Sequence, residues 1–418
     1  MKETGHHPDA VEFSLKKTLQ RILRGLIQTI KKILQWTFLI VVGLSLISAL
    51  YNLTLPRKSK IVGLLSMQEK SLIAEAMHLQ KTLGNEVWPG WGDAFTPRMV
   101  YNETYAFLLG YPDPPAGWVK MPKEEVRGTD WEVVQTDDFF SETYYRQFLP
   151  NPAITPENFT VKVGPQWVST MQTKEYAAIA FYQGLHQELP PVLNSIFPYS
   201  LFWRTLMGRP ENYIVGLMHE SFHAFQGTQA PQRLADAESV AGLEKDYPWD
   251  EPSNAEGWIV EIDFLMKALH AENNVSALQS VQQFLIKRSE RRKKAGLSVE
   301  MISYEQKREW LEGLAKYAEL TLGLKASQSE TYKNAQEIES VSSFKHYKTF
   351  PRFYRLQVNE VKRMSRHSGE SRFYYTGMLQ ALMLDRLMPD WKKEAFGEGI
   401  WLDDLLRKAV SFPSDKAI

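Results

Sequence analysis

The longest uninterrupted hydrophobic pattern lies near the N-terminus. Residues 36–55 carry no charge, and the run is about as long as a helix needs to be to cross ~30 Å of hydrocarbon. Trp36 and Tyr51 lie near its ends, where amphipathic rings prefer the headgroup layer. We interpret the run as a single transmembrane helix in contact with the lipid bilayer. A cleaved signal peptide and a buried core helix are the alternatives, and the long leader before the run argues against a signal peptide.

Residues 1–35 alternate apolar residues with lysine and arginine. Between residues 15 and 34 this pattern is typical of a basic amphipathic helix that lies on an anionic membrane surface. Fewer basic residues follow the apolar run, and they lie in or near a short linker over 56–61: Arg57, Lys58 and Lys60. By the positive-inside rule, this imbalance predicts a cytoplasmic N-terminus and an extracytoplasmic body.

Beyond the linker, the pattern predicts one α+β domain over 62–418. Helical periodicity over 62–84 precedes a stretch rich in Trp, Gly and Pro, and short runs at 130–135 and 158–170 are typical of strands. From about residue 174 onward the pattern is almost wholly helical. The expected fold is therefore mainly helical with a small N-terminal sheet.

The composition of the chain limits which partners and which metal ligands are expected. The chain has 49 basic residues (Lys and Arg) and 49 acidic residues (Asp and Glu), so its formal net charge is zero. It lacks the excess of positive charge that attracts nucleic acid, and no nucleic-acid partner is expected. The chain has no cysteine, which excludes thiolate nucleophiles, disulfides and cysteine-based zinc sites. Any metal site must use histidine and carboxylate ligands. The basic cluster at 287–296 is interpreted as a solvated helix face.

Candidate chemistry begins with His219, Glu220 and His223, which form an HExxH motif. The apolar periodicity of residues 212–226 predicts a helix, and residues i and i+4 project from the same helix face, so both imidazoles reach one ion. We expect a zinc ion on His219 and His223. Glu220 would be the general base that takes a proton from metal-bound water, and the substrate would be a peptide or protein.

A second segment, residues 310–319 (WLEGLAKYAE), resembles the W-L-N-E-G-F-A-x-Y-x-E segment of gluzincin metallopeptidases of the aminopeptidase-N type. The resemblance implies that Glu312 is the third zinc ligand, on a helix over 309–322, and that Glu319 matches the outer glutamate of the motif. The asparagine before the ligand is missing, and the spacer after the HExxH motif is longer than in the aminopeptidases. We attribute the longer spacer to an inserted helical hairpin at 256–295. Glu256 and Glu238 are the alternative third ligands.

A third segment, residues 373–385 (FYYTGMLQALMLD), is similar to the Y-x-x-G-A stretch that follows the ligand helix in aminopeptidase and glycyl-aminopeptidase gluzincins. By position, Tyr374 is the residue that stabilises the oxyanion, with Tyr375 the next candidate and a packing role the alternative for both. Such a donor is needed because attack on a carbonyl places negative charge on its oxygen. Together the three segments imply a zincin-like catalytic domain.

These features predict a single-pass, membrane-anchored zinc metallopeptidase. A catalytically silent zincin-fold protein that serves as a membrane-tethered binding module is one alternative, although retention of Glu220 argues against it. A zinc hydrolase of a non-peptide substrate is another, since the same residues support that chemistry. The chain lacks the G-x-M-E-N motif that captures an α-amino group in aminopeptidase N, which favours endopeptidase action.

Overall fold

The computed structural model describes residues 8–122, 125–135, 137–140, 143–150 and 155–411. The chain divides into two compact units. One comprises the residues up to Arg57 together with Ile179–Leu206, and the other comprises Lys58–Ala178 and Met207–Ile418. The first unit therefore combines the N-terminal apolar run with a segment that lies far from it in the sequence.

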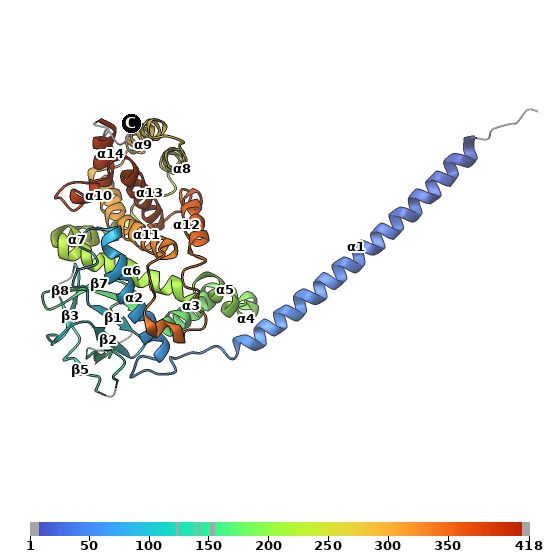
Figure 1. Cartoon of the computed structure of the whole chain (residues 1–418). Coiled ribbons are helices and arrows are strands. Elements are labelled where there is room, and N and C mark those ends of the chain that lie inside the picture. Colours follow the sequence, from blue (N-terminus) through green and yellow to red (C-terminus); the bar gives the residue numbers. More distant parts are fainter. Residues whose placement is uncertain (1–7, 123–124, 136, 141–142, 151–154, 412–418) are drawn as a thin grey trace, which may run out of the picture. The chain divides into compact units, whose positions relative to one another are not determined.

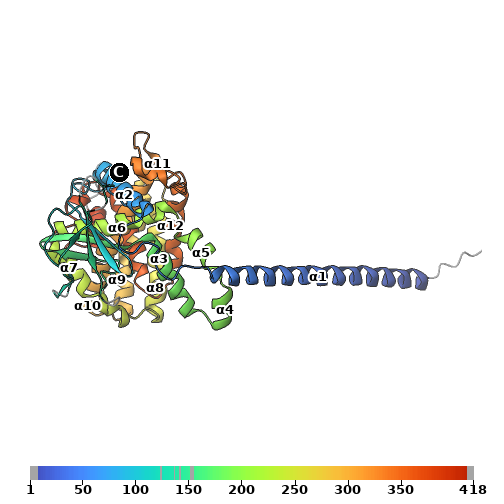
Figure 2. The same ribbon diagram turned by 90° about the horizontal axis from the view of Figure 1, so that it is seen from below.

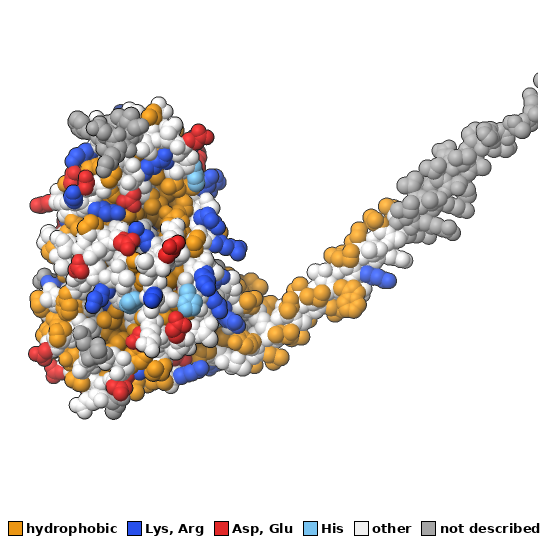
Figure 3. All heavy atoms as spheres, in the orientation of Figure 1, with side chains coloured by type: hydrophobic (Ala, Val, Ile, Leu, Met, Phe, Trp, Pro, Cys, Tyr) orange, Lys and Arg blue, Asp and Glu red, His pale blue; other side chains and the backbone are white. Residues whose placement is uncertain are grey.

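The first unit is built on α1 (Pro8–Asn52), a single uninterrupted helix (Figure 1). Within it, Gly25–Asn52 is long and apolar enough to cross a membrane, and its apolar side chains are exposed (Figure 3). The helix ends at Asn52, before the expected end of the span at residue 55. The side chains of residues 1–22 and 24 lie outside the described residues, so the amphipathic pattern expected there stays a prediction. The second half of α3 (Lys174–Glu188), α4 (Pro191–Ile196) and α5 (Tyr199–Leu206) complete this unit.

The second unit contains a single sheet whose eight described strands run in the order β4-β3-β7-β8-β1-β2-β6-β5. All neighbouring strands are antiparallel except β1 and β8, which are parallel. The run at 158–170 forms the hairpin of β7 and β8, with Gly164 in its turn at a positive φ of 54°. The run at 130–135 contributes only the short β5. The strand bounds are Arg98–Tyr101 (β1), Tyr105–Leu109 (β2), Trp118–Lys120 (β3), Val126–Arg127 (β4), Glu132–Val133 (β5), Tyr145–Phe148 (β6), Thr160–Val163 (β7) and Gln166–Gln172 (β8).

Helices make up most of the rest of the second unit, so the mixed, mainly helical fold is confirmed. The hairpin expected at 256–295 is α8 packed on α9, and Asn273 caps α9 by accepting a hydrogen bond from the Ser276 amide at 2.8 Å. The helix bounds are Met67–Val87 (α2), Pro210–Gln229 (α6), Pro231–Ser239 (α7), Ala241–Lys245 (η2), Pro252–Leu269 (α8), Asn274–Lys294 (α9), Val299–Arg308 (α10), Glu309–Gly313 (η3), Leu314–Gln328 (α11), Gln336–Ser340 (η4), Phe350–Met364 (α12), Ser371–Leu387 (α13), Trp391–Lys393 (η5) and Leu402–Ser411 (α14).

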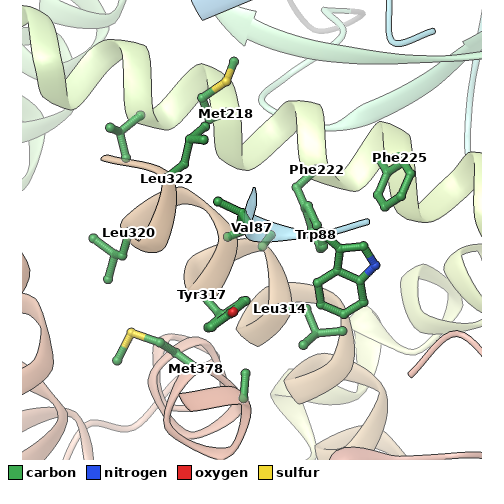
Figure 4. Packing of buried hydrophobic residues seen from close by; sticks show 14 of the residues in the cluster. Val87, Trp88, Met218, Phe222, Phe225, Leu314, Tyr317, Leu320, Leu322 and Met378 are labelled. Carbon is green, nitrogen blue, oxygen red and sulfur yellow. The ribbon is translucent and has the colours of Figure 1, made fainter. Parts of the chain in front are cut away.

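The core of this unit surrounds α6, which packs on strand β8 and on helices α2 and α11. Figure 4 shows Phe222 projecting from α6 toward Trp88. The rings of Trp88 and Trp91 meet Phe222 edge-on at centroid distances of 5.2 and 5.1 Å. The Trp-rich stretch after α2 therefore belongs to the core that encloses the HExxH helix.

The basic cluster at 287–296 is not a solvated face, and the prediction was wrong for three of its arginines. Arg288, Arg291 and Arg292 are buried, and each is paired with carboxylates from other elements: Glu261 on α8, Glu305 on α10, Glu309 in η3 and Asp403 on α14. A buried guanidinium is tolerated only when its charge and its donors are satisfied. Arg288 uses both of its terminal nitrogens on the two oxygens of Glu309, at 2.6 and 2.7 Å, and so anchors η3.

Two glycines bring η3 and α13 into backbone contact. A Cβ on Gly313 would lie 2.4 Å from Cα of Gly377, and one on Gly377 would lie 2.3 Å from the carbonyl oxygen of Glu309. Both distances are far inside van der Waals contact, and the opposing atoms are main chain. The helices therefore cross at a separation that only glycine permits on each side.

Replacing Gly377 by alanine should destabilise the second unit by about 1–3 kcal/mol, because overpacking forces backbone shifts. The matched control is Gly242→Ala, since a Cβ at Gly242 meets no atom within 4 Å. Thermal unfolding of the detergent-solubilised full chain measures both variants. A Gly377→Ala protein as stable as the parent would contradict the close crossing.

Candidate metal centre

Helix α6 carries the HExxH residues on its buried middle turns. It covers the expected helix 212–226 and extends it at both ends. His219 and His223 are 8% and 5% exposed, whereas the neighbouring Glu220 is partly accessible. The imidazoles are thus shielded from solvent while one carboxylate beside them remains reachable from outside.

Glu312 lies in η3, a π-helical turn that joins α10 to α11. Single π-helical turns inside α-helices occur frequently at functional sites. Oε2 of Glu312 lies 3.3 Å from Nε2 of His219 and 3.3 Å from Nε2 of His223, and these two nitrogens are 3.1 Å apart. The structure therefore brings His219, His223 and Glu312 together as a group that could hold a metal ion.

The dimensions of this group fit a small divalent cation. In a tetrahedral zinc site with bonds of about 2.0–2.1 Å, the ligand atoms are about 3.3–3.4 Å apart. The three edges measured here, 3.1, 3.3 and 3.3 Å, are close to that value. Two imidazoles and one carboxylate suit zinc as well as other divalent transition metals, and three protein ligands leave a fourth position open.

Gln226 fixes the tautomer of His223. Its amide nitrogen donates to the main-chain carbonyls of Trp310 and Leu311 at 3.0 and 3.3 Å, and these oxygens only accept. Its amide oxygen therefore faces Nδ1 of His223, 2.8 Å away, so Nδ1 carries the hydrogen. In the neutral ring this leaves a lone pair on Nε2, the nitrogen that faces Glu312. The hydrogen bonds from the Gln226 amide to the two carbonyls also connect α6 to η3.

The other ring nitrogen of His219 faces Glu319. Nδ1 of His219 lies 3.0 Å from Oε2 of Glu319, whose second oxygen accepts a hydrogen bond from Lys316 at 2.5 Å. Burial lowers the pKa of His219, but the carboxylates of Glu312 and Glu319 outweigh it and raise the pKa to about 10. The surroundings of the His219 imidazole therefore favour positive charge, and a divalent cation bound beside it would be stabilised by the same carboxylates.

Arg308 holds the second oxygen of Glu312 at 2.9 Å and also donates to Glu370 at 2.7 Å. Burial raises the pKa of Glu312, yet His223 and Arg308 bring it well below its usual range, so the side chain is a carboxylate.

Glu238 lies 3.5 Å from Arg308, and burial raises its pKa to about 7. Of the two alternative ligands, Glu238 pairs with Arg308 and is not part of the donor group, and Glu256 is exposed.

Glu220 and Tyr374 flank the donor group. Burial raises the pKa of Glu220, while His219 and His223 lower it in part. The ring of Tyr374 lies parallel to that of His219, at 5° and 5.8 Å between centroids. Burial and the nearby charge of Glu312 raise the pKa of Tyr374 well above its usual value, so its phenol stays protonated. The Tyr375 hydroxyl instead donates to Gln357 on α12 at 2.9 Å.

Sequence reasoning missed Gln226 and Arg308. Both stand at helical spacings from a proposed ligand, since Gln226 follows His223 by three residues and Arg308 precedes Glu312 by four. That spacing was the available signal. It does not distinguish a residue that orients a ligand from an ordinary surface neighbour.

The arrangement as a whole is a candidate metal centre of two imidazoles and a carboxylate on crossing helices. Comparison of the chain with protein-family models, curated proteins and solved structures finds no match. The likeness to gluzincins therefore rests on the active-site segments alone, and function has to be inferred from the geometry of this centre.

Glu312→Gln should weaken zinc binding at least 100-fold, because the amide keeps the shape of the carboxylate but loses its charge. Glu256→Gln is the matched control and should bind zinc as the parent does, since Glu256 is exposed and outside the donor group. Zinc titration of the purified full-length variants measures both. Loss of zinc by Glu256→Gln together with normal binding by Glu312→Gln would show that Glu256 is the ligand.

Proposed function

We propose that this protein is a membrane-anchored zinc metallopeptidase of the gluzincin type, with His219, His223 and Glu312 as metal ligands. The observation that carries the proposal is the triangle of two Nε2 atoms and one carboxylate oxygen with edges of 3.1–3.3 Å. Zinc, when bound there, supplies Lewis acidity and lowers the pKa of a coordinated water. The resemblance of the three segments to gluzincins points to peptide bonds as the substrate.

Glu220 is proposed as the general base. It follows the first ligand on α6 and is partly accessible. Burial raises its pKa, which makes the carboxylate a better proton acceptor than a fully solvated glutamate. Glu220 can therefore take a proton from the attacking water and later pass it to the leaving amine. These roles distinguish the proposal from a silent binding module.

Tyr374 is proposed as the donor to the oxyanion. Its phenol stays protonated because burial and the charge of Glu312 raise its pKa. Its ring stands parallel to that of His219, which places the side chain beside the ligand group. A preorganised donor of this kind strengthens its hydrogen bond as negative charge develops on the carbonyl oxygen.

The membrane part of the proposal rests on α1. Its Gly25–Asn52 portion has the length and composition of a membrane span, and the excess of basic residues before the run favours a cytoplasmic N-terminus. The catalytic unit would then lie on the extracytoplasmic side, tethered by one helix.

Glu220→Gln should retain zinc but lower peptide hydrolysis by about 10²–10⁴-fold, because the amide preserves shape while removing the base. A complex peptide library analysed by mass spectrometry gives the rates, and elemental analysis gives the zinc content. The control is Glu256→Gln, an exposed glutamate on α8. Parental activity in Glu220→Gln would exclude Glu220 as the base, and a zinc-loaded parent that cleaves no peptide would favour the binding-module alternative.

Tyr374→Phe should lower kcat by about 10²–10³-fold with little change in KM, because the ring and its packing on His219 remain while the donor is lost. Tyr375→Phe is the matched control in the same helix, since its hydroxyl is bonded to Gln357. It should leave kcat near the parent value. Equal rates for Tyr374→Phe and the parent would assign Tyr374 a packing role.

A further inference from the structure

The segment that joins α1 in the first unit has an unusually apolar surface. Residues 189–206 contain no aspartate or glutamate and a single basic residue, Arg204. Apolar side chains on both of its helices are exposed: Val192 (75%), Leu193 (50%), Leu201 (66%) and Phe202 (41%). Contiguous exposed apolar patches on a folded unit mark a surface that meets a partner or a membrane.

This segment packs on the C-terminal part of α1. Figures 1 and 2 both show α4 beside that end of the helix. Gly43, Ser45, Ser48, Ala49 and Asn52 form a partly buried face of small or polar residues, whereas the other side chains described between residues 23 and 52 are exposed. The Asn52 amide donates to the carbonyls of Ser195 and Phe197 at 3.0 and 2.9 Å, which satisfies the C-terminal end of α4. Small residues at such a face allow close packing of helices within a membrane.

The position of this contact along α1 determines how deep α4 would lie in the bilayer. Residues 45–52 lie inside the uncharged run that ends at residue 55, so with a rise of 1.5 Å per residue α4 packs within roughly 15 Å of the end of that run. The C-terminal end of α4 contacts Asn52, three residues before residue 55 and therefore roughly 5 Å from the end of the run, which is the depth of the boundary between headgroups and acyl chains. Aromatic residues, which favour that layer, cluster in the same segment and in the adjoining part of α3: Phe181, Tyr182, Phe197, Tyr199, Phe202 and Trp203.

A groove of about 560 Å³ lies between the C-terminal part of α1 and the segment that packs on it. Leu46, Leu50 and Leu53 of the α1 segment line one part of it, and Tyr182 and Tyr199 line another. Because its walls are largely apolar and open beside a candidate membrane helix, the groove suits an acyl chain. Arg57 also lines it and supplies a positive charge for a lipid phosphate.

We propose that residues 181–206 form a second membrane-contacting element, which lies in the headgroup and acyl-chain boundary beside the C-terminal end of α1. The occupant of its apolar surface and of the groove is bilayer lipid. The element inserts in one leaflet in the manner of an interfacial helix and does not cross the membrane. This inference depends on α1 spanning the bilayer and is independent of the proposed catalytic chemistry.

The absence of cysteine from the chain allows a direct test by single-cysteine spin labelling of the full-length protein in phosphatidylcholine vesicles. Labels at Val192→Cys and Leu201→Cys probe the element. Ile40→Cys in the apolar run is the hydrocarbon reference, and Val299→Cys on α10 is the matched control, because Val299 is also an exposed apolar side chain (78%). Collision rates with oxygen, which concentrates in lipid, are compared with those with a water-soluble nickel chelate.

The oxygen-to-nickel collision ratio at Val192→Cys and Leu201→Cys should approach that of the Ile40→Cys reference and exceed that of Val299→Cys several-fold. A ratio equal to that of Val299→Cys at both positions would show that the surface faces water and would overturn the proposal. Low collision rates with both reagents would indicate a protein contact, such as a second copy of the chain, and would overturn it equally. Neither result bears on hydrolysis, so the catalytic proposal is tested separately.

Discussion

The backbone contact between Gly313 and Gly377 is the constraint on which the candidate site depends. It lets the π-helical turn η3 and helix α13 cross without intervening side chains, and a Cβ on either glycine would lie 2.3–2.4 Å from main-chain atoms of the opposing segment. Glu312 immediately precedes one glycine, and Tyr374 lies three residues before the other. The close crossing therefore carries both side chains to the histidines of α6, the proposed ligand from one helix and the proposed donor from the next.

Buried charge pairs hold this crossing in register. Arg288 fixes Glu309 at the start of η3, and Arg308 fixes the outer oxygen of Glu312. Burying ions costs several kcal/mol each in desolvation, and only close pairing offsets that cost. Such networks are weak evidence for stability, but they define orientation strongly, because a displaced carboxylate would leave a buried guanidinium unpaired. We infer that the arginines of α9 and α10 serve to position η3.

The two histidines are oriented by different means that lead to the same result. An amide, Gln226, presents its oxygen to one ring, and a carboxylate, Glu319, faces the other. In both rings Nδ1 is directed away from the donor group, so Nε2 faces Glu312. Outer contacts of this kind typically change metal affinity or activity by 10-fold to 100-fold when lost. The proposed metallopeptidase function thus draws support from the surroundings of the ligands as well as from the HExxH motif.

By itself, the sequence determined what depends on local periodicity and composition. This includes the apolar run, most of which lies in α1, the predominance of helix after residue 174, and the common face of His219 and His223, because helical spacing alone places i and i+4 together. Tertiary structure decided which glutamate meets the histidines, that Arg288, Arg291 and Arg292 are buried, and that residues 179–206 join α1 in one unit. Each of these depends on partners far away in the chain. The sequence pattern alone predicts that a charged residue is solvated, because the carboxylates that allow it to be buried come from elements far away in the chain.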